Sequence, residues 1–323
     1  MLDLISNNLL VAAILLYLVA MLCYAVEYAF GSDSAVARVA ERAPALVGAG
    51  APISSQDRPD VGDGAVSAAQ RRARLAGLAG VVSTVLAAVA HGGTLVTRGF
   101  AADRVPWGNM YEFVVATCFV GTVAWLVVLA YRPALRHLGL FLALIQLIML
   151  GVAGMSLYAA AGPLVPALNS YWLKIHVGTI SAASGILLVG FVAAALTLIR
   201  TGYDEGKVSF PYSLGNRLPA AEGLERLTFR VHAFAFPLYT FAVICGAIWA
   251  EAAWGRYWGW DPKETWSFIA WVVYACYLHA RATPSIKRST ATWIAVAGWG
   301  VMQINLYGVN LVISGLHSYA GVN

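Results

Sequence analysis

Charged side chains are scarce in this chain of 323 residues. They make up 11% of the sequence, whereas hydrophobic residues make up 60%. Soluble globular domains carry about 25% charged residues and cannot bury so large a share of apolar side chains. The composition therefore excludes an ordinary soluble domain and predicts an all-α, polytopic membrane helix bundle.

Common catalytic and metal-binding motifs are missing as well. No glycine-rich nucleotide loop and no Ser–His–Asp pattern is visible, and the carboxylates Glu27, Glu112 and Glu251 are scattered singly near helix ends. The four cysteines form no C-x-x-C pair and no zinc-like cluster, so we interpret them as small core residues. They are Cys23, Cys118, Cys245 and Cys276.

Eight apolar runs are long enough to cross a bilayer, which takes about 20 helical residues. They cover residues 9–30, 75–97, 113–131, 138–158, 171–199, 231–251, 266–282 and 292–314. The first run lacks a basic leader, so we expect it to remain as a transmembrane helix (residues 1–30) rather than be cleaved as a signal peptide.

The segment 31–74 is rich in Ala, Gly, Pro, Asp and Ser and shows no apolar periodicity. This composition is typical of a mobile linker. It predicts that the first helix is separated from a seven-helix domain, residues 75–323, which includes a tryptophan-rich loop at 252–266.

The positive charges predict the orientation of the chain. Of its 21 Lys and Arg residues, 16 lie on the same side of the membrane as the linker. The positive-inside rule then makes the linker cytoplasmic and places both termini and the tryptophan-rich loop outside. Since these cations gather at the ends of apolar runs, the net charge of +5 indicates lipid bilayer contact and no nucleic-acid partner. Arg outnumbers Lys by 17 to 4, as in GC-rich bacteria, so we expect a bacterial plasma (inner) membrane rather than a thylakoid.

The loop contains the stretch W-G-R-Y-W-G-W-D-P-K-E-T-W, with four tryptophans in the thirteen residues 254–266. Its second half predicts a helix start near Asp261, because Asp261 can cap the first amides, Pro262 suits the first turn and Glu264 completes a capping box. Its first half predicts a flat aromatic platform rimmed by cations. The platform consists of Trp254, Tyr257, Trp258 and Trp260, the cations at its rim are Arg256 and Lys263, and Trp266 ends the stretch. The alternative is a membrane-interface aromatic belt.

Histidines fall at two levels of the predicted bundle. His176 lies near the outer end of the fifth run, and His317 follows the eighth run, also outside. His279 lies eighteen residues after Asp261, so it is about 27 Å deeper at the helical rise and near the inner leaflet. His232 begins the sixth run at a similar inner level.

Two outer imidazoles beside an aromatic surface match the needs of haem. Its iron takes two axial nitrogens, its face stacks on indole, and its propionates favour Arg, Lys or a helix N-terminus such as the one at Asp261. An ionisable side chain within a membrane segment, such as His279, is also a functional candidate.

These motifs resemble a known family. The tryptophan stretch, Y-L-H-A-R around His279 and G-V-N-L-V-I-S-G-L-H-S-Y at residues 308–319 resemble the "WWD" signature of haem-handling proteins. The similarity is greatest to the CcsA/ResC branch of the system II cytochrome c biogenesis family, called CcsB in actinobacteria. It extends to P-W-G-N-M-Y-E at residues 106–112, although it gives no role to Asn109, Tyr111 or Glu112.

The resemblance implies that haem b is carried outward and presented to apocytochrome c for covalent attachment. It implies that His176 and His317 are outer axial ligands, that His279 is a transmembrane haem ligand, and that residues 254–266 bind haem. It also implies a membrane partner of the Ccs1/ResB type, with attachment activity only in the complex. The second ligand of His279 could come from that partner or from His232.

The alternative function is a membrane cytochrome that keeps its haem for electron transfer. Such bundles generally place two ligand histidines on each of two helices, whereas here the candidates fall one per helix. A solute transporter is disfavoured because no pair of helices shows matched Gly or Pro breaks in two halves.

Overall fold

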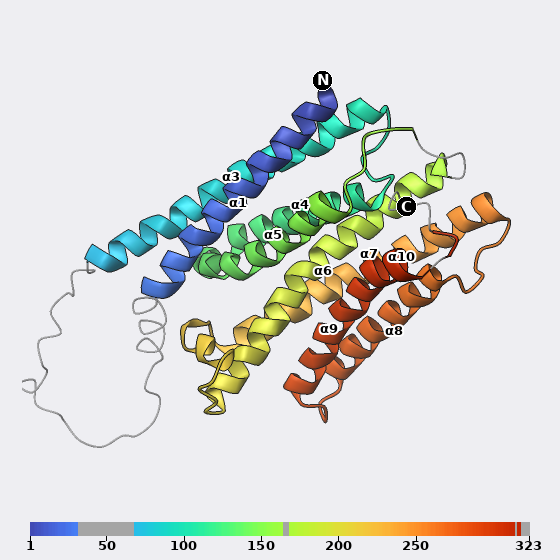
Figure 1. Cartoon of the computed structure of the whole chain (residues 1–323). Helices are drawn as coiled ribbons and strands as arrows, with labels where there is room; N and C mark the ends of the chain where they lie inside the picture. The colour runs from blue at the N-terminus through green and yellow to red at the C-terminus, as the bar shows by residue number, and fades with distance from the viewer. Residues whose placement is uncertain (32–67, 164–167, 314, 318–323) are drawn as a thin grey trace, which may run out of the picture.

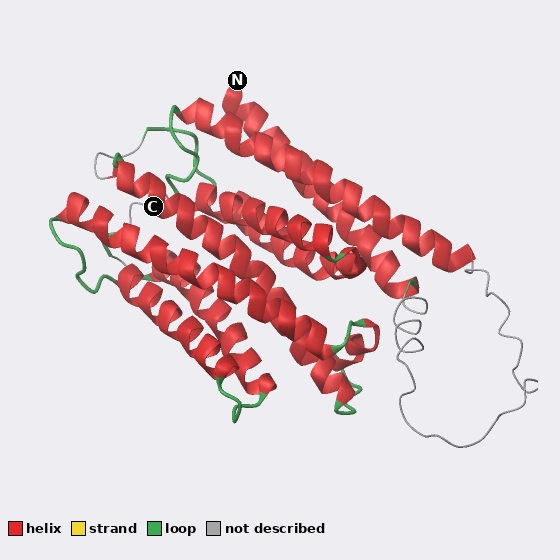
Figure 2. Ribbon diagram, turned by 180° about the vertical axis from the view of Figure 1, so that it is seen from behind, coloured by secondary structure: helices red, strands yellow, loops and turns green. Residues whose placement is uncertain are grey.

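The computed structural model describes residues 1–31, 68–163, 168–313 and 315–317. Within these ranges the regular secondary structure is entirely helical and no strand is present (Figure 2), which confirms the predicted all-α bundle. The long helices are α1 (Leu2–Phe30), α3 (Ala68–Ala102), α4 (Met110–Tyr131), α5 (Gly139–Ser156), α6 (Tyr171–Asp204), α7 (Ala221–Trp254) and α8 (Pro262–Ala282). A last rod joins α9 (Arg288–Gln303), the π-helix η4 (Ile304–Gly308) and α10 (Val309–Val312).

Several helices extend beyond the apolar runs that predicted them. Helix α7 begins at Ala221 instead of 231, so the sequence analysis was wrong to place His232 at a helix start. Helix α3 begins at Ala68, inside the segment predicted as linker. Both extra turns carry charged residues, which lower hydropathy without preventing helix formation. The rest of that predicted linker, residues 32–67, lies outside the described residues.

Six of the described helices are long and apolar enough to cross a membrane, which makes the chain a multi-pass membrane protein. They are α1, α3, α4, α6, α7 and the segment Pro133–Ser156 that contains α5. Helices α8 and α9 are not among them, and α9 has only 16 residues. Eight crossings therefore remain a prediction.

Consecutive helices run antiparallel, and α1 lies beside α3, α6 beside α7, and α8 beside α9 (Figure 1). One end of the bundle holds the N-terminus, the α3–α4, α5–α6 and α7–α8 connections and the end of α10. We call this the outer end, following the predicted orientation.

Gly185 allows α6 to approach α4 closely. A Cβ atom built on Gly185 would lie 2.5 Å from the backbone oxygen of Thr117 and 2.7 Å from the amide nitrogen of Gly121. Backbone atoms cannot move aside as a side chain can, so only glycine fits this contact.

Replacing Gly185 with Ala should therefore push α4 and α6 apart. We expect the overpacked variant to lose about 1 to 3 kcal/mol of unfolding free energy, measured as a lower midpoint of thermal unfolding in detergent. Gly151→Ala in α5 is the control, because no atom lies within 4 Å of its added Cβ. Equal stability of the two variants would contradict the close packing of α4 on α6.

Candidate functional site

A cavity opens at the outer end of the bundle, among α4, α6, α7, α8 and the last rod. The cavity has a volume of about 200 Å³, and its lining is mostly apolar and aromatic. The lining includes six residues that matter for its chemistry. They are His176, Trp249, Trp254, Trp258, Lys263 and His317.

His176 is held by the packing of α6 against α7. Its Nδ1 atom lies 2.8 Å from the carbonyl oxygen of Ala242, and because a carbonyl only accepts, Nδ1 carries the proton. The lone pair is therefore on Nε2. A Cβ atom on Gly246 would lie 2.7 Å from the imidazole, so this glycine makes room for the ring. The imidazole stacks on Trp249, with ring centroids 6.3 Å apart and planes 9° apart.

His317 lies near the end of the sequence, far from His176, and its ring packs against the same indole, that of Trp249. Its ring centroid lies 5.8 Å from that of Trp249 and 5.1 Å from that of Trp254. Its Nδ1 atom donates to a carboxylate oxygen of Asp261 at 2.8 Å, which again places the lone pair on Nε2. The structure thus brings together the two outer histidines that the sequence indicated.

Asp261 links the start of α8 to this histidine. The predicted capping box is confirmed, since Asp261 accepts from the amide of Lys263 and its own amide donates to Glu264. The same carboxylate accepts from the amide of Leu316 at 2.7 Å. Burial raises the pKa of Asp261, but the hydrogen bonds from His317 and Leu316 outweigh it and lower that pKa to about 2. Asp261 is therefore an anion at neutral pH.

The region that contains these residues matches a known protein family. The model of the family described as "Cytochrome C assembly protein" matches residues 107–317, which include both histidines and the whole tryptophan stretch. The chain belongs to this family.

Several similar proteins bear the name "Cytochrome c biogenesis protein CcsA". The one from Guillardia theta is 36% identical over 260 residues, which cover 76% of this chain and 86% of that protein. Those from Gloeobacter violaceus (32% over 304 residues, 79% and 90% covered) and Thermosynechococcus vestitus (34% over 277 residues, 75% and 86%) are similar over comparable lengths. This chain is thus a CcsA-type member with a role in cytochrome c biogenesis.

The two predicted cations of the CcsA-type site differ in position. Arg256 pairs with Glu264 at 3.2 Å, lies over the Trp254 ring and is not among the cavity-lining residues. Lys263 does line the cavity, and its ammonium group donates to the carbonyl oxygen of Asn305 in the π-helix at 3.1 Å. Lys263 is therefore better placed than Arg256 to meet a carboxylate inside the cavity.

The aromatic residues do not form the single flat platform that the sequence predicted. Trp254, Tyr257 and Trp258 line the cavity, whereas Trp260 and Trp266 do not. The rings of Trp258 and Trp260 stand perpendicular, and Trp260 is 65% exposed. The loop bends sharply at Trp260, where φ is +57°, so successive indoles face different directions.

His279 lies apart from the cavity, on the exposed face of α8. His232 is buried, donates from Nδ1 to the carbonyl oxygen of Thr228 at 2.8 Å and packs against Tyr277. No contact between the two imidazoles occurs in the part of the chain that the structure describes. The option of an intrachain His232–His279 pair is therefore not supported.

The sequence analysis missed several aromatic residues of the cavity, among them Trp249 and Trp107. Trp249 lies inside an apolar run, where nothing distinguishes it from a core residue. Trp107 belongs to P-W-G-N-M-Y-E, and this motif was the signal that could have identified it.

The double role of Asp261 can be tested by hydrogen exchange. Asp261→Ala should remove the helix cap, at about 1 kcal/mol, and also release the chain at Leu316. We expect faster amide exchange in a peptide covering residues 315–317, measured by mass spectrometry. Ser170→Ala is the control, because Ser170 caps α6 through the amide of Trp172 and touches neither Asp261 nor the end of the chain. Accelerated exchange in both variants would contradict a specific tether.

Proposed function

We propose that this chain binds haem b in the outer cavity and presents it for covalent attachment to apocytochrome c. It would act in a system II cytochrome c synthase complex with a Ccs1/ResB-type partner, in a bacterial plasma membrane with the cavity facing outward. Haem is here the cargo that the complex delivers to its client.

The observation that carries the proposal is the convergence of His176 and His317 on one indole. Each imidazole is fixed through Nδ1 by a protein acceptor and has its lone pair on Nε2, the arrangement that suits an iron ligand. The two elements that supply them are distant in sequence, so local helix packing alone does not explain their meeting.

The lining suits the rest of the cargo. Indole and phenol rings match the apolar macrocycle, and the amino group of Lys263 supplies a hydrogen-bond donor for a carboxylate. The attachment reaction adds a cysteine S–H across a vinyl C=C bond, so a carbon–sulfur bond forms and nothing leaves. In this reaction the chain's own residues would hold and orient the cargo near the outer surface.

We also propose that His279 contacts haem at an inner site shared with the partner. Its imidazole is exposed on a helix whose neighbouring surface residues Phe268 and Val272 are apolar. An ionisable side chain at membrane depth normally faces protein or water rather than lipid. Exposing this imidazole to lipid would cost free energy. A partner that covers this face of α8 and supplies the second ligand would remove that cost.

No specific observation favours a haem-retaining electron-transfer cytochrome. Within the described residues, the two candidate ligands that converge do so at the end of the bundle, near a surface open to a client.

The outer site is tested by His176→Ala and His317→Ala in a host whose only cytochrome c maturation system is this chain and its partner. Each variant should reduce covalent haem in a reporter cytochrome at least tenfold, with partial recovery when imidazole fills the vacated position. His137→Ala is the control, since this histidine stacks on Tyr28 at the opposite end of the bundle. Normal assembly in both outer variants would overturn the proposal.

The inner site is tested by comparing His279→Ala with His232→Ala in the purified complex. Haem content, measured by absorption, should fall in the His279 variant only, because His232 is buried against Tyr274 and Tyr277 and does not line the cavity. Equal losses in both variants would instead assign both ligands to this chain.

A further inference from the structure

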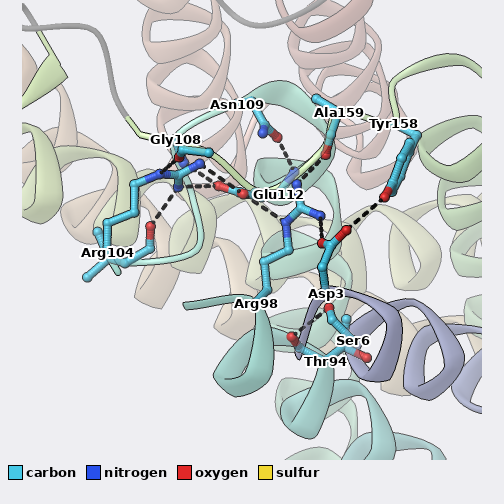
Figure 3. Close-up of polar contacts among 12 residues, drawn as sticks. Asp3, Ser6, Thr94, Arg98, Arg104, Gly108, Asn109, Glu112, Tyr158 and Ala159 are labelled. Carbon is cyan, nitrogen blue, oxygen red and sulfur yellow. Dashed lines mark hydrogen bonds and ion pairs between the residues drawn. The ribbon is translucent and has the colours of Figure 1, made fainter. Parts of the chain in front are cut away.

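A buried cluster of charges lies beside the cavity at the outer end of the bundle (Figure 3). From its geometry we infer that Glu112 is a positioning residue, which fixes the segment Trp107–Asn109 as a wall of the cavity and thereby holds the turn of α6 that carries His176. This inference rests on the proposed function of the cavity.

Both carboxylate oxygens of Glu112 are used. Oε1 accepts from Nε of Arg98 at 2.9 Å and from Nη2 of Arg104 at 3.1 Å. Oε2 accepts from Nη1 of Arg104 and from the amide of Gly108, each at 2.7 Å. Glu112 and Arg98 are each 1% exposed. The Glu112–Arg98 pair is therefore shielded from water. Hydrogen bonds between charged groups are stronger in such a buried environment than in water.

The two arginines extend the cluster to distant segments. Arg98, at the end of α3, also pairs with Asp3 of α1 at 3.1 Å and donates to the carbonyl of Ala159. Arg104 donates to the carbonyl oxygen of Gly162 at 2.9 Å. Glu112 thus ties the starts of α1 and α4 and the end of α3 to the connections before α4 and after α5. Figure 3 shows Glu112 between the two guanidinium groups.

The connection before α4 is the link to the cavity. Its residues Trp107, Gly108 and Asn109 all line the cavity. Glu112 fixes this backbone through its carboxylate, which accepts from the Gly108 amide. Next to that bond, the side chain of Asn109 caps α4 by accepting from the backbone amide of residue 112 at 2.9 Å.

Trp107 then transmits this position to α6. Its indole Nε1 donates to the carbonyl oxygen of Lys174 at 3.2 Å. Its ring also lies 3.4 Å from the point where a Cβ atom of Gly178 would be. Lys174 and Gly178 precede and follow His176 by two residues each. Trp107 therefore packs on the helical turn that presents His176 to the cavity.

Stability alone is a weak reason for such a cluster. Replacing a buried ion pair by apolar residues of similar volume is often neutral or stabilising, so buried charges need another explanation. The inner end of the bundle provides a comparison, since Glu27 accepts there from Nε of Arg136 at 2.7 Å. That pair is also largely buried, but neither residue lines the cavity.

The test compares Glu112→Gln with the matched control Glu27→Gln in the purified complex. Glutamine keeps the side-chain volume but removes the charge that holds the guanidinium groups. We expect faster amide exchange in a peptide covering residues 105–110 and roughly tenfold weaker haem retention in the Glu112 variant only, with partial rescue by Glu112→Asp. The control should lose comparable thermal stability without either change.

Each outcome decides the inference. Normal exchange and normal haem retention in a folded Glu112→Gln variant would overturn it, and so would equal haem loss in the Glu27 control. If Glu112→Gln does not fold, Trp107→Leu should lower haem retention without disturbing the charges, and wild-type retention in that variant would overturn the inference. Wild-type protein that retains no haem would refute the proposed function instead, while the exchange comparison would still test the positioning.

Discussion

The hydrogen bonds of one carboxylate join the start of α8 to the last residues of the family-matched region. Asp261 caps α8 and also holds Leu316 and His317, so the start of one helix fixes the position of the chain after α10. Gly315 allows this approach, because a Cβ atom there would lie 2.8 Å from the carboxylate. The cavity depends on this contact, since His317 would otherwise lie in a terminal segment with no defined position relative to His176.

What the sequence could predict was local. The capping box at Asp261, Pro262 and Glu264 was recognisable because a helix start depends on residues three positions apart. The bundle was recognisable from apolar runs, although their edges were misplaced where helices continue into charged turns, as before His232. The two outer histidines were also indicated, because their depths follow from the same helices and the motif gave them a common role.

What the sequence could not predict depends on tertiary packing. In the sequence, Trp249 lies inside an apolar run and Arg98 directly follows one, and neither has a local pattern that indicates its partners. Arg98 belongs to α3, which precedes the family-matched residues, yet it binds Glu112 within them. The indole directions at Trp258 and Trp260 depend on a left-handed backbone turn that composition does not reveal. Interactions of this kind are fixed only when distant segments meet.

The bilayer explains why the polar and irregular features gather at the two ends of the bundle. A membrane core tolerates regular helices but not unpaired backbone groups, so bent loops and charge clusters belong near the surface. At the outer end, His176 and His317 each have a protein acceptor for Nδ1, which makes the proposed outer site complete within this chain. The side chain of His279 shows no such bond among the described residues and lies on an exposed helix face. The proposed outer site therefore needs no second protein to hold its histidines. The proposed inner site needs one, because the described part of this chain gives the imidazole of His279 no such acceptor.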